Sequence, residues 1–223
     1  MTVPYDDDPL ERVGVLADPV RRALYRYVVT SPEPVGREEA AESLGLPRPR
    51  TKFHLDRLVD AGLLDVVFRR LTGRTGPGAG RPSKLYLRSD RQVSISLPQR
   101  RYDLASEVLA QAVERAAATD ASVTEAMRAV AHEVGRSLGD QSGAGADLES
   151  LGEVLDVQGY ETRVEGGELC LGNCPFDRLA REHTELACGM NLALIEGVVE
   201  ALPVRGATAR LQPEDGFCCV RVG

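Results

Sequence analysis

Residues 36–88 read GREEAAESLGLPRPRTKFHLDRLVDAGLLDVVFRRLTGRTGPGAGRPSKLYLR. The pattern predicts a helix over 37–44 closed by Gly45, and then a basic helix over about 49–61 that ends at Gly62. Residues 63–71 and 84–88 have the alternation of strands and flank a glycine- and arginine-rich loop. A short helix, a turn, a basic helix and a hairpin are the parts that lay one helix in a DNA major groove.

The segment before this stretch supports the same domain. Asp18 is an N-cap acceptor and Pro19 suits the first position of a helix, so we expect a helix over about 19–29. The glycine-rich loop resembles a phosphate cradle only superficially. It joins two strands rather than a strand and a helix, and it lacks the Gly-Lys-Ser/Thr of a P-loop.

Charge is distributed unevenly along the chain. The net charge is −7, but residues 48–91 carry 11 Lys and Arg against 4 Asp and Glu. Residues 101–223 carry 10 against 21. A local basic surface is what meets phosphates, so the acidic total does not exclude nucleic-acid binding.

Candidate DNA contacts lie on the basic helix and in the hairpin. The candidates are Arg48, Arg50, Thr51, Lys52, His54 and Arg57 on the helix, and Arg74, Arg81 and Lys84 in the hairpin. The forked guanidinium of arginine matches two acceptors of guanine, which suits the arginines near the start of the helix. Arg57 is placed for phosphate, and the hairpin residues are placed for phosphate or the minor groove. His54 is equally compatible with packing against a neighbouring helix. The sequence leaves open which residues read bases.

Two alanine-rich helices are expected next, over 103–118 and 121–138, each with an apolar stripe. We expect the stripes to pair in a homodimer, with packing inside one chain as the alternative. The segment SGAGA at 142–146 is a flexible break. We therefore divide the chain into a DNA-binding domain (1–92), a helical linker or dimerisation region (93–143) and a C-terminal domain (144–223).

The C-terminal domain is predicted to mix helices and strands, which makes the chain α+β. A helix over 148–157 precedes strands over 160–164 and 168–171, which Glu165-Gly-Gly joins as a hairpin. A helical stretch then runs from Pro175 to about Leu202, with a break near 184–188. Strands over 207–211 and 217–222 end the chain.

All the cysteines lie in this domain: Cys170, Cys174, Cys188, Cys218 and Cys219. Thiolates from separated segments suit an iron–sulfur cluster or zinc, although small buried apolar residues are the alternative, above all for Cys170. Cys174 begins a helix, where thiolate is favoured. The adjacent pair is expected on a strand, so only one of the two is expected to join a shared site. His183 is a candidate fourth ligand or a surface residue.

The segments LADPVRRALYRYV (16–28), FHLDRLVDAGLL (53–64) and GRPSKLYLR (80–88) resemble the winged helix–turn–helix of ArsR-type bacterial repressors. They are more closely similar to the branch that includes the iron–sulfur-assembly (Suf) repressor. The resemblance implies a cluster held by Cys174, Cys188 and one of Cys218 or Cys219, with Cys219 preferred. This chain departs from the family pattern in the additional Cys170 and in the doubled cysteine, and these departures leave iron–sulfur and zinc open.

These observations together predict a cytoplasmic, non-enzymatic regulator that binds double-stranded operator DNA as a homodimer. We expect it to act as a repressor. A cysteine-bound cluster or metal would modulate its affinity. The first alternative is an organic ligand in the C-terminal domain. The second is an enzyme with Cys174 as nucleophile and His183 as base, which no accompanying acid or oxyanion motif supports. No apolar run is long enough to cross a membrane.

Overall fold

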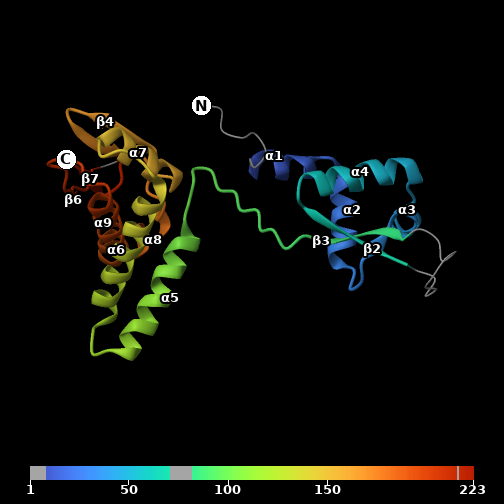
Figure 1. Cartoon of the computed structure of the whole chain (residues 1–223), viewed down its shortest axis with the longest axis horizontal. Coiled ribbons are helices and arrows are strands. Elements are labelled where there is room, and N and C mark those ends of the chain that lie inside the picture. Colours follow the sequence, from blue (N-terminus) through green and yellow to red (C-terminus); the bar gives the residue numbers. More distant parts are fainter. Residues whose placement is uncertain (1–8, 71–81, 215) are drawn as a thin grey trace. The chain divides into compact units, whose positions relative to one another are not determined.

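A computed structural model of the protein describes residues 9–70, 82–214 and 216–223. The chain divides into two compact units, residues 1–95 and 96–223. Each unit combines helices with an antiparallel sheet and has its own apolar core (Figure 1). The predicted α+β class is confirmed.

The first unit has the element order of a winged helix. Its sheet has the order β1-β3-β2, with antiparallel neighbours that include the pairs Val35↔Tyr86 and Val66↔Tyr86. The elements are α1 (Pro9–Gly14), η1 (Val15–Ala17), α2 (Pro19–Thr30), β1 (Val35–Gly36), α3 (Arg37–Ser43), α4 (Arg48–Asp60), β2 (Leu64–Arg69) and β3 (Ser83–Arg88).

Local signals explain why these elements begin and end where they do. The carboxylate of Asp18 accepts hydrogen bonds from the backbone N–H groups of Val20 and Arg21, at 2.8 and 3.0 Å, and so caps α2. Gly45, with φ of 62°, allows the tight turn between α3 and α4. The fully buried side chains of this unit include Leu24, Leu55, Leu58 and Leu64, which pack α2 and α4 against the sheet.

The second unit places a sheet with the order β4-β5-β7-β6 beside packed helices. Its helices are α5 (Tyr102–Ala118), α6 (Val123–Ser142), α7 (Leu148–Val157), α8 (Asp177–Glu182) and α9 (Thr184–Ala201); its strands are β4 (Thr162–Glu165), β5 (Glu168–Leu171), β6 (Ala209–Leu211) and β7 (Val220–Val222). The helices of the predicted 93–143 region belong to this same compact unit, because α5 packs on α6 and α6 packs along α9.

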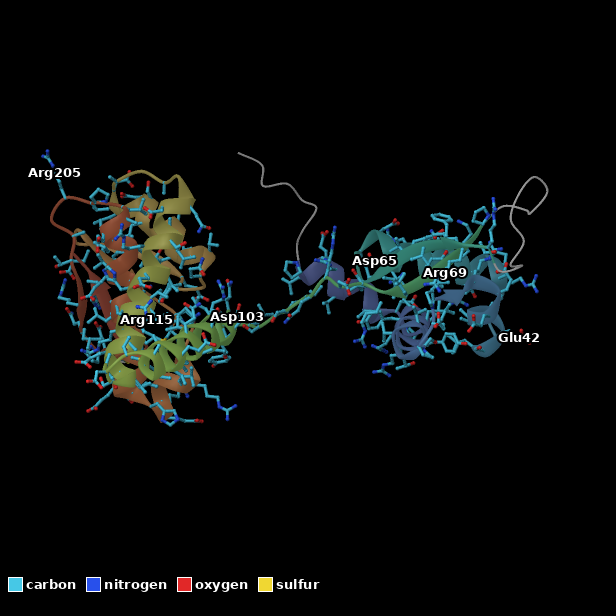
Figure 2. The ribbon with its side chains drawn as sticks, turned by 60° about the horizontal axis from the view of Figure 1, so that its bottom comes forward. Glu42, Asp65, Arg69, Asp103, Arg115 and Arg205 are labelled. Carbon is cyan, nitrogen blue, oxygen red and sulfur yellow. The ribbon has the colours of Figure 1, made fainter. Side chains whose placement is uncertain are left out.

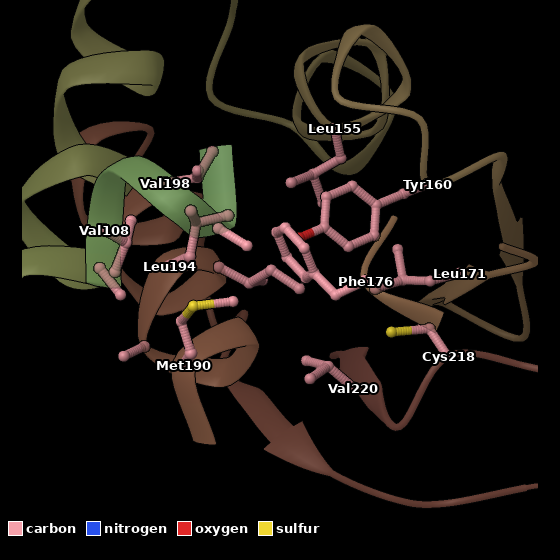
Figure 3. Close-up of a cluster of buried hydrophobic side chains, with 14 of the residues drawn as sticks. Val108, Leu155, Tyr160, Leu171, Phe176, Met190, Leu194, Val198, Cys218 and Val220 are labelled. Carbon is pink, nitrogen blue, oxygen red and sulfur yellow. The ribbon is translucent and has the colours of Figure 1, made fainter. Parts of the chain in front are cut away.

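Glycines allow α6 and α9 to approach closely. A Cβ atom added at Gly135 would lie 1.9 Å from the carbonyl oxygen of Leu194, and one at Gly197 would lie 2.1 Å from that of His132. The core beside this contact includes Val108, Leu194 and Val198 from the helices, as Figure 3 shows. The position of α9 therefore depends on the absence of side chains at these two residues.

In the described parts of the chain, no helix is both long enough and apolar enough to cross a bilayer.

We predict that Gly135→Ala destabilises the second unit although alanine is the better helix former. The added methyl group would overlap the α9 backbone, and overpacking of this kind costs about 1–3 kcal/mol or more. Urea unfolding, followed by amide resonances of α9, measures the loss. Gly14→Ala is the control, because a Cβ there meets nothing within 4 Å. Equal stability of the Gly135→Ala variant and the unchanged protein would contradict the close contact.

Candidate DNA-binding surface and thiol group

The outer face of α4 presents basic and aromatic side chains. Arg48, Arg50 and Arg57 are exposed, and Phe53 is 59% exposed. Phe53 was not among the residues predicted to contact DNA. Its sequence signal is an aromatic residue between Lys52 and His54 on the basic helix, and an exposed ring there is able to meet a thymine methyl group.

Two of the predicted contacts are turned inward. Thr51 is fully buried, and its hydroxyl donates to the carbonyl oxygen of Pro47 at 3.1 Å, so it closes the first turn of α4 instead of facing DNA. His54 is also buried; its Nε2 accepts from Arg50 at 3.4 Å, and its Nδ1 has no hydrogen-bond partner. Burial lowers the pKa of His54, which favours the neutral ring. Both side chains therefore face the interior of the unit, which for His54 agrees with the alternative of packing against a neighbouring helix.

A carboxylate connects α4 to the hairpin. Asp56 pairs with Lys52 at 2.7 Å and with Lys84 of β3 at 2.6 Å, and the Tyr86 hydroxyl donates to it at 3.1 Å. Burial alone would raise the pKa of Asp56, but these three donors outweigh it and lower the pKa to about 2. We call Asp56, Lys52, Lys84 and Tyr86 the Asp56 clamp. It fixes the base of the hairpin on the recognition helix.

Among the described hairpin residues, another arginine lies at the end of β2. Arg69 projects from β2, as Figure 2 shows, and pairs with Glu33 at 3.3 Å. Arg74 and Arg81 lie outside the described residues, so their predicted contacts with DNA stay predictions.

Four thiols come together in the second unit from three segments. Cys174 lies in the turn between β5 and α8, Cys188 lies near the start of α9, and the adjacent Cys218 and Cys219 precede β7. The thiols interact as neighbours, Cys174 with Cys218, Cys218 with Cys219, and Cys219 with Cys188. We call these four residues the thiol group.

Cys218 and Cys219 do not lie on the strand where they were expected, and the expectation that only one of them joins a shared metal site stays a prediction. Strand alternation would point them to opposite faces, but β7 begins only at Val220, after both of them. Their irregular backbone lets Cys218 reach Cys174 while Cys219 reaches Cys188.

The thiols differ in their readiness to ionise. The hydrogen bond from Cys218 lowers the pKa of Cys174, and hydrogen bonds from Cys218 and Cys188 lower the pKa of Cys219 to about 6. Burial raises the pKa of Cys188 to about 12. The pKa of Cys218 is also raised, because this thiol donates to its neighbours. Cys174 and Cys219 therefore lose their protons more readily than Cys188 and Cys218, and the thiolate is the form that reacts and binds metals.

A buried amide supports the thiol group. Asn191 of α9 is 1% exposed, and its Nδ2 donates to the sulfur of Cys218 at 3.1 Å, while the hydroxyl of Tyr160 donates to its Oδ1 at 2.5 Å. Figure 3 shows Tyr160 and Cys218 at one side of the core. Asn191 was not among the predicted site residues, although a polar residue three positions after Cys188 in an apolar helix segment was a signal for it.

Cys170 and His183, two further candidate ligands, lie outside the thiol group. Cys170 of β5 is buried, and its sulfur accepts a hydrogen bond from Arg221 at 3.1 Å and lies 4.0 Å from a carboxylate oxygen of Glu165. His183 is exposed where α8 ends and α9 begins. Neither of them takes part in the hydrogen bonds that connect the thiol group.

Metal-binding geometry is not ready-made. Across residues 9–70, 82–214 and 216–223, no group of three or more His, Cys, Asp or Glu side chains is arranged to hold a metal ion. The thiol contacts run as a chain from Cys174 to Cys188 rather than around one point. The donor chemistry nevertheless suits zinc or iron, which thiolates bind, and an ion would have to draw the sulfurs inward.

Comparison with known proteins identifies the first unit. Residues 16–67 match a family described as a helix-turn-helix domain, a span that runs from η1 into β2 and includes α4. No curated protein is a significant match to the chain. The first unit thus contains a helix-turn-helix domain, which indicates a DNA-binding transcription regulator. Domains of this kind bind DNA and are generally not enzymatic.

We predict that Asp56→Asn lowers the free energy of unfolding of the first unit at neutral pH but not in strong acid. The pKa of Asp56 is lowered from 3.8 to about 2, so its ionised carboxylate stabilises the fold above pH 3.8. This stabilisation is lost as the pH falls through about 2. The substitution should cost roughly 1–2 kcal/mol at pH 7, since the side chain is partly screened by solvent.

Urea unfolding followed by amide resonances of α4 at pH 7 and pH 2 measures this difference. Lys52→Ala is the partial control, because it removes only one of the three donors to Asp56. A deficit in Asp56→Asn that is the same at both pH values would show that the clamp is not electrostatic.

Proposed function

We propose that this protein is a homodimeric transcription repressor whose affinity for operator DNA is set by a metal centre at the thiol group. The observation that carries the proposal is the gathering of four thiols in the unit that follows a helix-turn-helix domain. A thiol group with and without metal gives the domain two states. If these states differ in their affinity for DNA, metal binding changes the DNA affinity by the free energy that couples the two binding events.

The metal would be held by Cys174, Cys188 and Cys219, with Cys218 able to replace or join them. Cys174 and Cys219 favour thiolate and come from different segments, so an ion would bridge the α8 turn to the approach to β7. Cys188 would add α9. When bound, an iron–sulfur cluster would supply sensitivity to oxidants, whereas zinc would supply a fixed structural cross-link.

The DNA contact would be made by the outer face of α4. Arg50 would read a base, because it is exposed near the start of the helix that enters the groove. Arg48 and Arg57 would position the helix on phosphates. Lys52 and Lys84 would meet phosphate by exchanging their partner Asp56 for it.

A homodimer is supported by apolar side chains left exposed on α5 and α6. Val113 is 56% exposed and Val123 is 47% exposed, although both stand in the predicted apolar stripes. A second copy that covered these residues would pair two recognition helices. The operator would then hold two half-sites separated by about one helical turn of DNA, or a multiple of it.

An organic effector is the second candidate, and a specific cavity favours it. A cavity of about 470 Å³ lies between the end of α6 and α7, lined by residues that include Leu138, Val154, Val157 and Gln158. Its volume is within the range of small-molecule sites. A regulator that used this cavity would keep its response after Cys174→Ser and Cys188→Ser, whereas the proposed metal sensor would lose it.

We predict that Arg50→Ala weakens specific operator binding about 10- to 100-fold, as expected for loss of a base contact worth ~1–3 kcal/mol. Binding to unrelated duplex should change little. Mobility-shift titrations at fixed salt, with footprinting of the site, measure both affinities. Arg205→Ala removes an exposed arginine outside the helix-turn-helix domain and is the control. Unchanged operator affinity in Arg50→Ala would remove this residue from base recognition.

The metal proposal predicts that protein purified without oxygen carries iron with sulfide, or zinc, at one centre per chain. Visible absorption and metal analysis should show the centre, and Cys174→Ser, Cys188→Ser and Cys219→Ser should each lose most of it. Cys170→Ser should retain it, because that thiol bonds to Arg221 instead. Metal-free, colourless protein whose operator affinity equals that of the Cys174→Ser variant would refute the sensor.

A further inference from the structure

The chain that leaves the helix-turn-helix domain is held at the turn that carries Cys174. The carbonyl oxygen of Gln99 accepts from Nδ2 of Asn173 at 3.0 Å. The guanidinium of Arg100 donates to Oδ1 of Asn173 and, at 3.1 Å, to the carbonyl oxygen of Cys174. The backbone N–H of Arg101 donates to the carbonyl oxygen of Pro175 at 3.1 Å. We call Gln99, Arg100 and Arg101 the linker clasp.

The clasp also bonds to the segment that follows α7. Arg101 donates to the side-chain oxygen of Gln158, and Nδ2 of Asn173 donates to the carbonyl oxygen of Gly159 at 2.6 Å. Gly159 has φ of 89°, and a Cβ there would lie 2.9 Å from the Cβ of Gln99. Only a glycine allows Gln99 to lie this close, so the local backbone is shaped to receive the clasp.

Asn173 is built into this arrangement rather than exposed beside it. Its side chain is buried, with 8% of the residue exposed, and both its amide hydrogen-bond groups have partners in the clasp. Its backbone N–H donates to the carbonyl oxygen of Tyr160 at 2.8 Å. A buried amide satisfied in this way holds one arrangement, because a shift of either side leaves a donor or acceptor unpaired.

Cys174 faces the thiol group and the clasp at once. Its thiol is a neighbour of the Cys218 thiol, while its carbonyl oxygen accepts a hydrogen bond from the guanidinium of Arg100. Arg100 also lies 3.8 Å from Asp177 in the first turn of α8. The carbonyl oxygen of Arg101 accepts from Ala105, so the first turn of α5 begins at the clasp. A displacement of Cys174 is therefore transmitted directly to the place where the linker becomes helix.

We propose that the linker clasp couples the state of the thiol group to the linker, with Arg100 as the positioning residue. The inference rests on the proposed function in taking the thiol group as the sensor. Rotation of the thiol side chains around an ion would leave the backbone of the 173–175 turn in the arrangement that the clasp fits and would restrict its motion. Modified thiols push that turn away and release the clasp.

Release of the clasp would lengthen the linker. Residues 96–101 span at most about 20 Å when extended. A longer flexible linker lowers the effective concentration of one recognition helix at its half-site once the other is bound. Operator affinity then falls although α4 itself is unchanged.

Hydrogen exchange of the full chain, followed by mass spectrometry, tests the coupling. The segment to measure is 96–104, without metal, with Zn²⁺, and after alkylation with iodoacetamide. We expect Zn²⁺ to slow exchange in this segment and alkylation to speed it by about tenfold or more. In Arg100→Gln the segment should exchange fast in all three conditions, while Zn²⁺ binds with unchanged stoichiometry.

Two controls separate coupling from damage to the fold. Exchange of the α9 amides should be the same in Arg100→Gln as in the unchanged protein, and Arg205→Gln should behave as the unchanged protein throughout. Cys174→Ser should resist the effect of alkylation. If no Zn²⁺ binds, the proposed metal site fails and the alkylation comparison alone decides the clasp. Alkylation that leaves exchange at 96–104 unaltered, or that alters it equally in Arg100→Gln, would overturn the inference.

Discussion

The close contact of α6 with α9 is the constraint on which the second unit depends. Backbone meets backbone at Gly135 and Gly197, so α9 has one position along α6. That position places Cys188 and Asn191 beside the segment that leads into β7. The turn before α8 then brings Cys174 to the same place. Close backbone packing at these glycines, beside the contacts of Glu200 in α9 with His132 and Arg136 in α6, thus positions the reactive groups of the unit.

The two units use charge in different ways. In the first unit, the Asp56 clamp ties Lys52 of α4 and Lys84 of β3 to one carboxylate, while Arg48, Arg50 and Arg57 are exposed on α4. In the second unit, ionisable thiols are largely withdrawn from solvent and balanced by donors such as Asn191. The linker clasp lies at the start of the second unit. Its hydrogen bonds to the backbone of Cys174 and Pro175 connect the thiol group directly to the linker.

Much of the fold was predictable because its signals are local. Asp18-Pro19, Gly45 and Gly62 mark helix ends, and the hairpin alternation marks β2 and β3. The break between α8 and α9 at His183 also fell close to its predicted place. The predictions that failed concern side chains whose placement is decided by tertiary contacts. Thr51 and His54 carry polar groups suited to DNA but face the interior, and Cys218 and Cys219 precede the strand on which they were expected. Asn173, Asn191 and the clasp depend on contacts 14 to 74 residues apart along the chain, which no local pattern contains.

The proposed sensor requires that four thiols form one group from which Cys170 is separate. Mild oxidation of the metal-free protein, followed by fragmentation and mass mapping of disulfides, tests this directly. We expect cross-links of Cys174 and Cys188 to the adjacent pair Cys218 and Cys219, with Cys170 recovered as a free thiol. Cross-links that involve Cys170, or none that join the Cys174 turn or α9 to the approach to β7, would contradict the account.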